Sequence, residues 1–134
     1  MMSQPPKPSA AETRILRVLW EREPRTVRDI HEQLSDERGD DAVGYTTVLK
    51  QMQRMTAKGL IVREPGPGRS HRYRAGVGET DTKSGLFDRF VRTAFDGSVP
   101  DLVMHALGTD ATDPDDIARI RALLDSLESR GRDN

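Results

Sequence analysis

Seven cationic side chains lie between Tyr45 and Ala75, and this segment holds a single acidic residue, Glu64. Positive charge gathered on so short a stretch is typical of proteins that contact DNA phosphates. The segment is therefore the first place to look for function. The cations are Lys50, Arg54, Lys58, Arg63, Arg69, Arg72 and Arg74.

The apolar residues of the same segment predict how these cations are presented. Val48, Met52 and Met55 recur at helical spacing and predict a helix over 45–57, with Gly59 placed to end it in a left-handed conformation. Residues 60–64 and 71–75 alternate like strands around a Pro/Gly turn at 65–68. The pattern predicts a helix followed by a two-stranded wing.

Several side chains of this helix and wing could contact DNA. Thr46 and Thr47 could meet a phosphate or a thymine methyl group, Gln51 could pair with adenine, and Arg54 could bind guanine or phosphate. In the alternative interpretation the threonines cap the helix, the cations form a solvated face, and His71 packs on the sheet. The full candidate DNA-binding set is Thr26, Tyr45, Thr46, Thr47, Lys50, Gln51, Arg54, Arg69, His71 and Arg72.

Two more helices are predicted before this segment. Ser9 and Glu12 form a capping box ahead of an amphipathic helix that Pro24 ends, and Thr26 with Asp29 caps a second one. Arg25 and Thr26 lie in a short extended link, Trp20 and Tyr73 are expected in the core, and residues 35–41 are expected to form a loop. We therefore predict a flexible tail over 1–8 and a winged helix-turn-helix domain over 9–78.

The remainder of the chain has a different charge and a different predicted role. Residues 1–78 carry a net charge of +4, and residues 79–134 carry −5. A small, polar stretch over 76–83 marks the boundary, and three amphipathic helices follow, the last capped by Asp113. About fifty residues bury too little core to fold alone, so a homodimer is expected. The predicted dimerisation residues are Leu86, Phe87, Phe90, Leu102, Leu107, Ile117, Ile120, Leu124 and Leu127. The predicted fold class is mainly α with a small β-hairpin wing, followed by an α-helical dimerisation region.

Composition argues against several other classes of protein. The chain has no cysteine, and its three histidines fall in different predicted elements without ligand spacing, so neither a metal nor another cofactor is expected. No set of side chains suggests a catalytic centre, and an enzyme is not expected. The polar start and the lack of a long apolar run predict a cytoplasmic protein.

Short motifs along nearly the whole chain resemble the penicillinase and methicillin-resistance repressor family (BlaI/MecI). They include Val18-Leu19-Trp20, Tyr45-Thr46-Thr47-Val48, Lys58-Gly59-Leu60 and Gly68-Arg69 with His71 and Tyr73. The resemblance implies a homodimeric repressor of transcription that binds a palindromic operator in double-stranded DNA. It also implies relief of repression by cleavage in the dimerisation region, brought about by a membrane-bound sensor with a metalloprotease domain. His105-Ala106 is the corresponding bond here.

Two other functions stay open at this stage. A winged helix can serve as a protein–protein interaction module without affinity for duplex DNA, and the salt dependence of duplex binding would distinguish the two. A ligand-responsive regulator would need a small binding site, and the sequence contains no obvious ligand domain.

Overall fold

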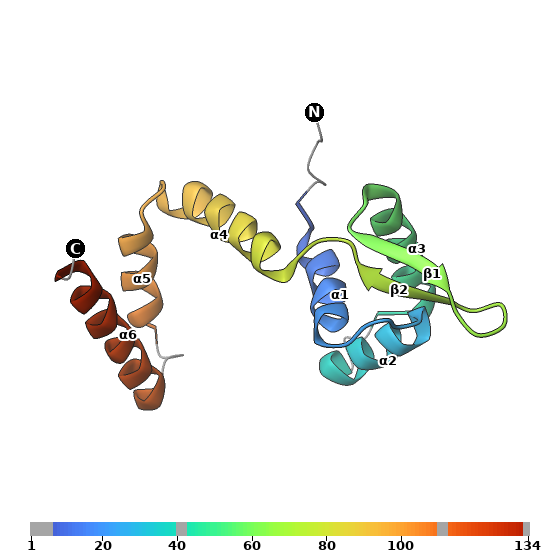
Figure 1. Ribbon diagram of the computed structural model, residues 1–134, viewed down its shortest axis with the longest axis horizontal. Helices are drawn as coiled ribbons and strands as arrows, with labels where there is room; N and C mark the ends of the chain where they lie inside the picture. Colours follow the sequence, from blue (N-terminus) through green and yellow to red (C-terminus); the bar gives the residue numbers. More distant parts are fainter. Residues whose placement is uncertain (1–6, 40–42, 110–112, 133–134) are drawn as a thin grey trace. The chain divides into compact units, whose positions relative to one another are not determined.

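The computed structural model describes residues 7–39, 43–109 and 113–132 (Figure 1). Contacts group residues 1–87 into one compact unit and residues 88–134 into another, so the division lies inside helix α4. The boundary after residue 78 rests on composition and remains a prediction. The elements are α1 (Ala10–Glu21), α2 (Val27–Arg38), α3 (Tyr45–Lys58), β1 (Ile61–Pro65), β2 (His71–Ala75), α4 (Glu79–Phe95), α5 (Val99–Leu107) and α6 (Pro114–Arg132).

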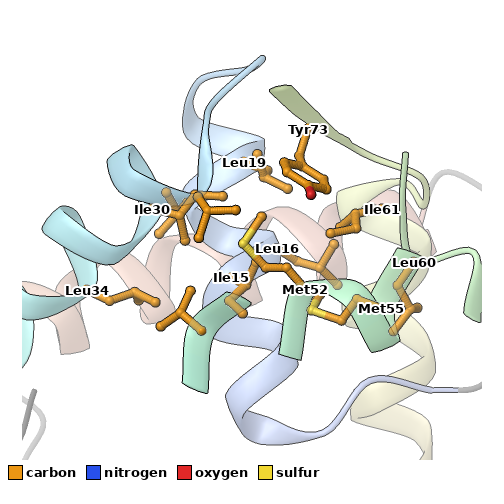
Figure 2. Packing of buried hydrophobic residues seen from close by; sticks show 13 residues of the cluster. Ile15, Leu16, Leu19, Ile30, Leu34, Met52, Met55, Leu60, Ile61 and Tyr73 are labelled. Atoms are coloured by element: carbon orange, nitrogen blue, oxygen red, sulfur yellow. The ribbon is translucent and has the colours of Figure 1, made fainter. Parts of the chain in front are cut away.

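The core of the first unit is built from three helices and the wing. Each element contributes one apolar face, as Figure 2 shows. Tyr73 is buried among these residues, so its predicted place in the core is confirmed. Trp20 is only partly buried and packs against the core from the edge. The labelled residues are Ile15, Leu16 and Leu19 of α1, Ile30 and Leu34 of α2, Met52 and Met55 of α3, and Leu60, Ile61 and Tyr73 of the wing.

Local hydrogen bonds fix where the first two helices begin. The Glu12 N–H donates to Ser9 Oγ at 3.2 Å, and the Ser9 N–H donates to Glu12 Oε1 at 2.9 Å. Thr26 and Asp29 form the same reciprocal pair at the start of α2. Both predicted capping boxes are confirmed, and each satisfies backbone donors that a helix start leaves unpaired.

The wing is an antiparallel hairpin closed on the helices by backbone bonds. Val62 lies opposite Arg74, and Glu64 lies opposite Arg72. The extended link before α2 joins the same sheet, because the Arg25 N–H donates to Tyr73 O at 3.1 Å and the Tyr73 N–H donates to Arg25 O at 2.8 Å. Three helices and this wing form a winged helix-turn-helix, as predicted from the sequence.

Two glycines and the single tryptophan shape the ends of the wing. Gly59 ends α3 with a φ of 83°, where a side chain would be strained, so its predicted left-handed conformation is confirmed. A Cβ on Gly76 would lie 2.6 Å from the Gly59 carbonyl oxygen, so only glycine fits this crossing. Just beyond it, Trp20 Nε1 donates to Val77 O at 3.1 Å and ties α1 to the exit of the wing.

Two segments are more helical than the sequence predicted. Helix α2 continues to Arg38, so the predicted loop over 35–41 was wrong at 35–38, and residues 40 and 41 lie outside the described part. A Gln33–Glu37 hydrogen bond of 3.1 Å spans the last turn of that helix. Helix α4 already begins at Glu79, inside the small, polar stretch over 76–83 where the boundary was placed. A Lys83–Glu79 ion pair of 2.9 Å and acidic residues in the first turn stabilise that start.

The second unit has capped helices but little core of its own. Ser98 Oγ accepts from the Asp101 N–H at the start of α5, and Asp113 Oδ1 accepts from the Asp116 N–H at the start of α6. Among the described residues of 88–132, Val91 is the only buried one. None of the described helices combines the length and apolar character needed to cross a membrane.

Candidate nucleic-acid interface

One face of α3 points to solvent while the opposite face anchors the helix. Val48, Met52 and Met55 are at most 1% exposed and hold α3 in the core. Because these three residues share one side of the helix, the side chains on the opposite side are turned outward. We call this outward side the α3 face, and its members are Thr46, Thr47, Lys50, Gln53, Arg54 and Ala57, all of them exposed.

Two predicted contact residues lie beside the α3 face rather than on it. Gln51 is half-buried at the edge of the core, and Tyr45 is 46% exposed at the first helical position. The ring of Tyr45 meets the ring of His31 edge-on, with 5.7 Å between their centroids. Tyr45 is thus held against α2.

His31 also fixes the backbone that leads into α3. Its Nε2 lies 3.0 Å from the carbonyl oxygen of Val43 and 3.3 Å from Ser35 Oγ. A carbonyl oxygen only accepts hydrogen bonds, so Nε2 carries the hydrogen and donates it to Val43. This single side chain therefore joins α2 to the entry of α3.

The wing carries a second group of cations. The loop over 66–70 projects away from the helices and brings Arg69 with it (Figure 1). Arg63 and His71 are exposed on the strands, and Arg72 is half-buried. Exposure of the His71 ring argues against the alternative in which it packs on the sheet.

Internal ion pairs separate the seven cations into two groups. Lys58 Nζ lies 3.0 Å from Glu12 Oε2, and Arg74 Nε lies 3.0 Å from Glu64 Oε2. These two charges are already neutralised within the protein. Within the described part of the chain, the other five form no ion pair: Lys50, Arg54, Arg63, Arg69 and Arg72.

Glu12 is the one buried charged residue in the described ranges, and it serves both α1 and α3. Burial acts to raise the pKa of its carboxyl group. The N–H of Ser9 and the ammonium group of Lys58 outweigh that effect, so the pKa lies below its ordinary value. The end of α3 is thereby held to the start of α1 by a carboxylate that stays charged.

Thr26 lies apart from the cations, at the start of α2. Its hydroxyl oxygen accepts from the Asp29 N–H at 3.1 Å, which makes its first role structural. The hydroxyl hydrogen is not used in that bond and could be donated to a phosphate at the same time. Next to it, Arg25 is held by Gln33 and by the carbonyl oxygen of Arg22.

Two candidates on this surface were missed from the sequence. Gln53 is a member of the α3 face, and Arg63 is an unpaired cation of the wing. Helical spacing could have identified Gln53, because it follows Lys50 by three positions and Thr46 by seven. Arg63 was counted in the basic segment, but nothing in the strand pattern singled it out.

The predicted dimerisation residues lie on the helices after the wing, and most are exposed within the single chain. Leu86, Leu102 and Ile120 are half-buried. Four further large apolar residues are exposed beside them, namely Val99, Val103, Met104 and Leu123. The exposed members of the predicted set are Phe87, Phe90, Leu107, Ile117, Leu124 and Leu127.

His105 and Ala106, the predicted cleavage position, lie within α5. The ring of His105 meets the ring of Phe95 at a centroid distance of 5.8 Å. Elsewhere, no group of three or more potential metal ligands occurs among the residues that the structure describes.

Three helices, a two-stranded wing and an exposed, cationic α3 face define the class of winged-helix proteins. Comparison with known proteins then gives the family. The model of the penicillinase repressor family matches residues 8–126, and the chain belongs to that family of transcriptional repressors.

Individual relatives agree with this assignment. The chain is 34% identical over 122 residues to the transcriptional regulator BlaI of Mycobacterium tuberculosis. The aligned region covers 90% of this chain and 85% of that protein. Two solved structures share the fold at 22% identity. The match to the DNA-binding domain of the repressor BlaI covers 60% of this chain and 93% of that domain, with a TM-score of 0.50. The match to RosR of H. salinarum covers 95% of this chain and 99% of that chain, also with a TM-score of 0.50.

Proposed function

We propose that this repressor acts in the cytoplasm by binding a palindromic operator as a homodimer, with the α3 face of each protomer in the major groove of duplex DNA. The observation that carries the proposal is the set of five cations without an internal partner, on α3 and the wing. Charges left unpaired on one rigid unit can each bind a phosphate.

The α3 face has the chemistry that groove recognition requires. Thr46 and Thr47 stand at the beginning of the helix, where helix-turn-helix proteins approach base edges. Lys50 and Arg54 follow one and two turns later. Arg69, His71 and Arg72 of the wing would meet the backbone beside the groove. Tyr45 and Gln51 would contact DNA from the margins of the face, and Thr26 from the start of α2.

A dimer is supported by the apolar side chains of the second unit. Met104 is 73% exposed and Leu123 is 58% exposed in the single chain, and leaving so many large apolar groups in water is unfavourable. A second copy of the same segment would cover them symmetrically. Two α3 faces related by a twofold axis would then read half-sites about 34–36 Å apart, or a multiple of that distance.

Measured affinity for duplexes selected from a random pool tests the proposal. Lys50→Ala should flatten the log–log salt dependence by roughly 1.8, because each of two lost phosphate contacts is worth about 0.9. Arg54→Ala should weaken binding by about 1–3 kcal/mol per half-site if Arg54 reads a guanine. Arg17→Ala, which removes an exposed cation of α1, is the matched control. A chain that selects no duplex, or a Lys50→Ala/Arg54→Ala variant with unchanged affinity and salt slope, would contradict the assigned face.

Release from DNA completes the proposed mechanism. We propose cleavage within residues 102–108, by a protease under the control of a membrane-bound sensor, after local opening of α5. A protease needs an extended substrate, and α5 contributes no buried residue in the single chain, so its opening disrupts little core. Loss of α6 would leave weakly binding monomers. Immunoblotting under inducing conditions tests this step, and an intact full-length band while the target genes are on would exclude it.

A further inference from the structure

Gln53 is the side chain of the α3 face best suited to read a base, and its place follows from helical geometry. Successive residues of an α-helix are about 100° apart, which puts Gln53 about 60° from Lys50 around the axis. Gln51 lies about 100° from Lys50 on the other side, toward the core. The two glutamines are accordingly exposed and half-buried, respectively.

The carboxamide of Gln53 is also free to bind a ligand. Among the described residues, no hydrogen bond to its side chain is formed. Gln33 offers the contrast, because its amide is consumed inside the protein: Nε2 donates to Glu21 at 3.0 Å and to Glu37 at 3.1 Å. The α3 face therefore presents one uncommitted amide beside two cations, Lys50 and Arg54.

We propose that Gln53 reads an adenine in the major groove of each half-site. This inference rests on the proposed function, that is, on binding of duplex DNA by the α3 face. A carboxamide has a donor and an acceptor side by side, which match N7 and N6 of adenine in a bidentate pair. Lysine and arginine lack an acceptor, so neither Lys50 nor Arg54 can make that pair. Gln53 supplies sequence discrimination where its neighbours supply charge.

This role predicts a signature that a structural role would not give. Gln53 is neutral and exposed, so its loss changes neither the number of phosphate contacts nor the core. Gln53→Ala should leave the salt slope and the melting temperature unchanged while relaxing preference at one A·T pair in each half-site. The discrimination lost should be roughly 5- to 160-fold per half-site.

The experiment measures the affinity of the full-length protein for its selected duplex and for every single-base-pair change in it. Ser129→Ala, which removes an exposed neutral polar group of α6, is the control and should keep the wild-type preference. Gln51→Ala, the same chemical change two positions earlier, tells the two glutamines apart, because it should leave the preference at the A·T pair read by Gln53 unchanged. Gln53→Glu should shift the preference at the same position from A·T toward C·G, because a carboxylate accepts from N4 of cytosine.

Two outcomes would overturn the inference, and they are distinguishable. Salt-dependent, sequence-specific binding by the wild type, with preference unchanged in Gln53→Ala or relaxed instead in Gln51→Ala, would refute the role of Gln53 alone. A wild-type protein that selects no duplex would refute the proposed function and this inference with it.

Discussion

The two units of this chain bury their apolar residues very differently. In the first unit, the helices and the wing enclose residues such as Ile15, Leu19 and Met52 completely. In the second, α5 and α6 place no residue in a core, although α5 is about as amphipathic as the helices of the first unit. The same pattern of apolar residues thus gives a closed core where the chain supplies its own partner surface, and an open face where it does not.

The largest expected effect comes from placing charge on that open face. Leu124→Asp with Leu127→Asp should convert the proposed dimer to a monomer, because a carboxylate buried without a partner costs several kcal/mol. Sedimentation should show the monomer, and circular dichroism should show a winged helix that is still folded. Ser126→Asp adds the same charge at an exposed polar position of α6 and should remain dimeric. A dimeric double variant would place the interface elsewhere.

A matched pair of methionine truncations contrasts the two units directly. Met52→Ala removes a fully buried side chain and should lower the free energy of unfolding by about 2–5 kcal/mol. Met104→Ala removes a side chain that is 73% exposed and should leave the unfolding of the first unit unchanged. Urea titration of both variants measures the difference, and dilution should reveal a weaker dimer only for Met104→Ala. An equal loss in the free energy of unfolding for the two variants would contradict the contrast between the units.

The ion pair between α1 and α3 gives the first unit a pH dependence of known sign. The folded-state pKa of Glu12 lies below its ordinary value of 4.5, so its charge stabilises the fold above that pH. This stabilisation is lost as the pH falls through the folded-state pKa. Glu12→Gln should therefore be less stable by about 1 kcal/mol at neutral pH, since Lys58 is half-exposed. Urea midpoints of the variant and the wild type should converge in acid, and a gap that stayed constant with pH would disprove the assignment.

A smaller effect is expected at the junction of α2 and α3. His31→Ala removes the donor to Val43 and the edge contact with Tyr45, at a cost of about 0.5–1 kcal/mol. Operator affinity should fall because the start of α3 is less firmly placed, while sedimentation should show an unchanged dimer. Glu32→Ala, at the exposed neighbouring position of α2, serves as the control. An affinity equal to that of the wild type would mean that His31 does not position the helix.

Sequence patterns predicted the elements of the first unit well because their signals are local. The capping boxes at Ser9 and Thr26, the helix stop at Gly59 and the turn between the strands all depend on residues a few positions apart. The extension of α2 to Arg38 and of α4 back to Glu79 was missed, because polar helix ends stabilised by i,i+4 contacts look like loops. In both places, the polar composition suggested a loop where the backbone is helical.

The candidate site was harder to predict because it depends on which way each side chain points and on ion pairs between residues far apart in the sequence. Charge alone could not tell Lys50, which is unpaired, from Lys58, whose partner Glu12 is 46 positions away. Nor could residue type alone tell Gln53 from Gln51. The part played by His31 needs the contact between two helices, which no short motif encodes.

The bond from Trp20 to the exit of the wing has a practical consequence for spectroscopy. Trp20 is the only tryptophan in the chain, and its Nε1 donates to Val77 O at the point where the wing ends and α4 is about to begin. Indole emission responds to hydrogen bonding and to exposure of the ring. The native fluorescence of the unlabelled protein should therefore report on this one crossing, with no background from other indoles.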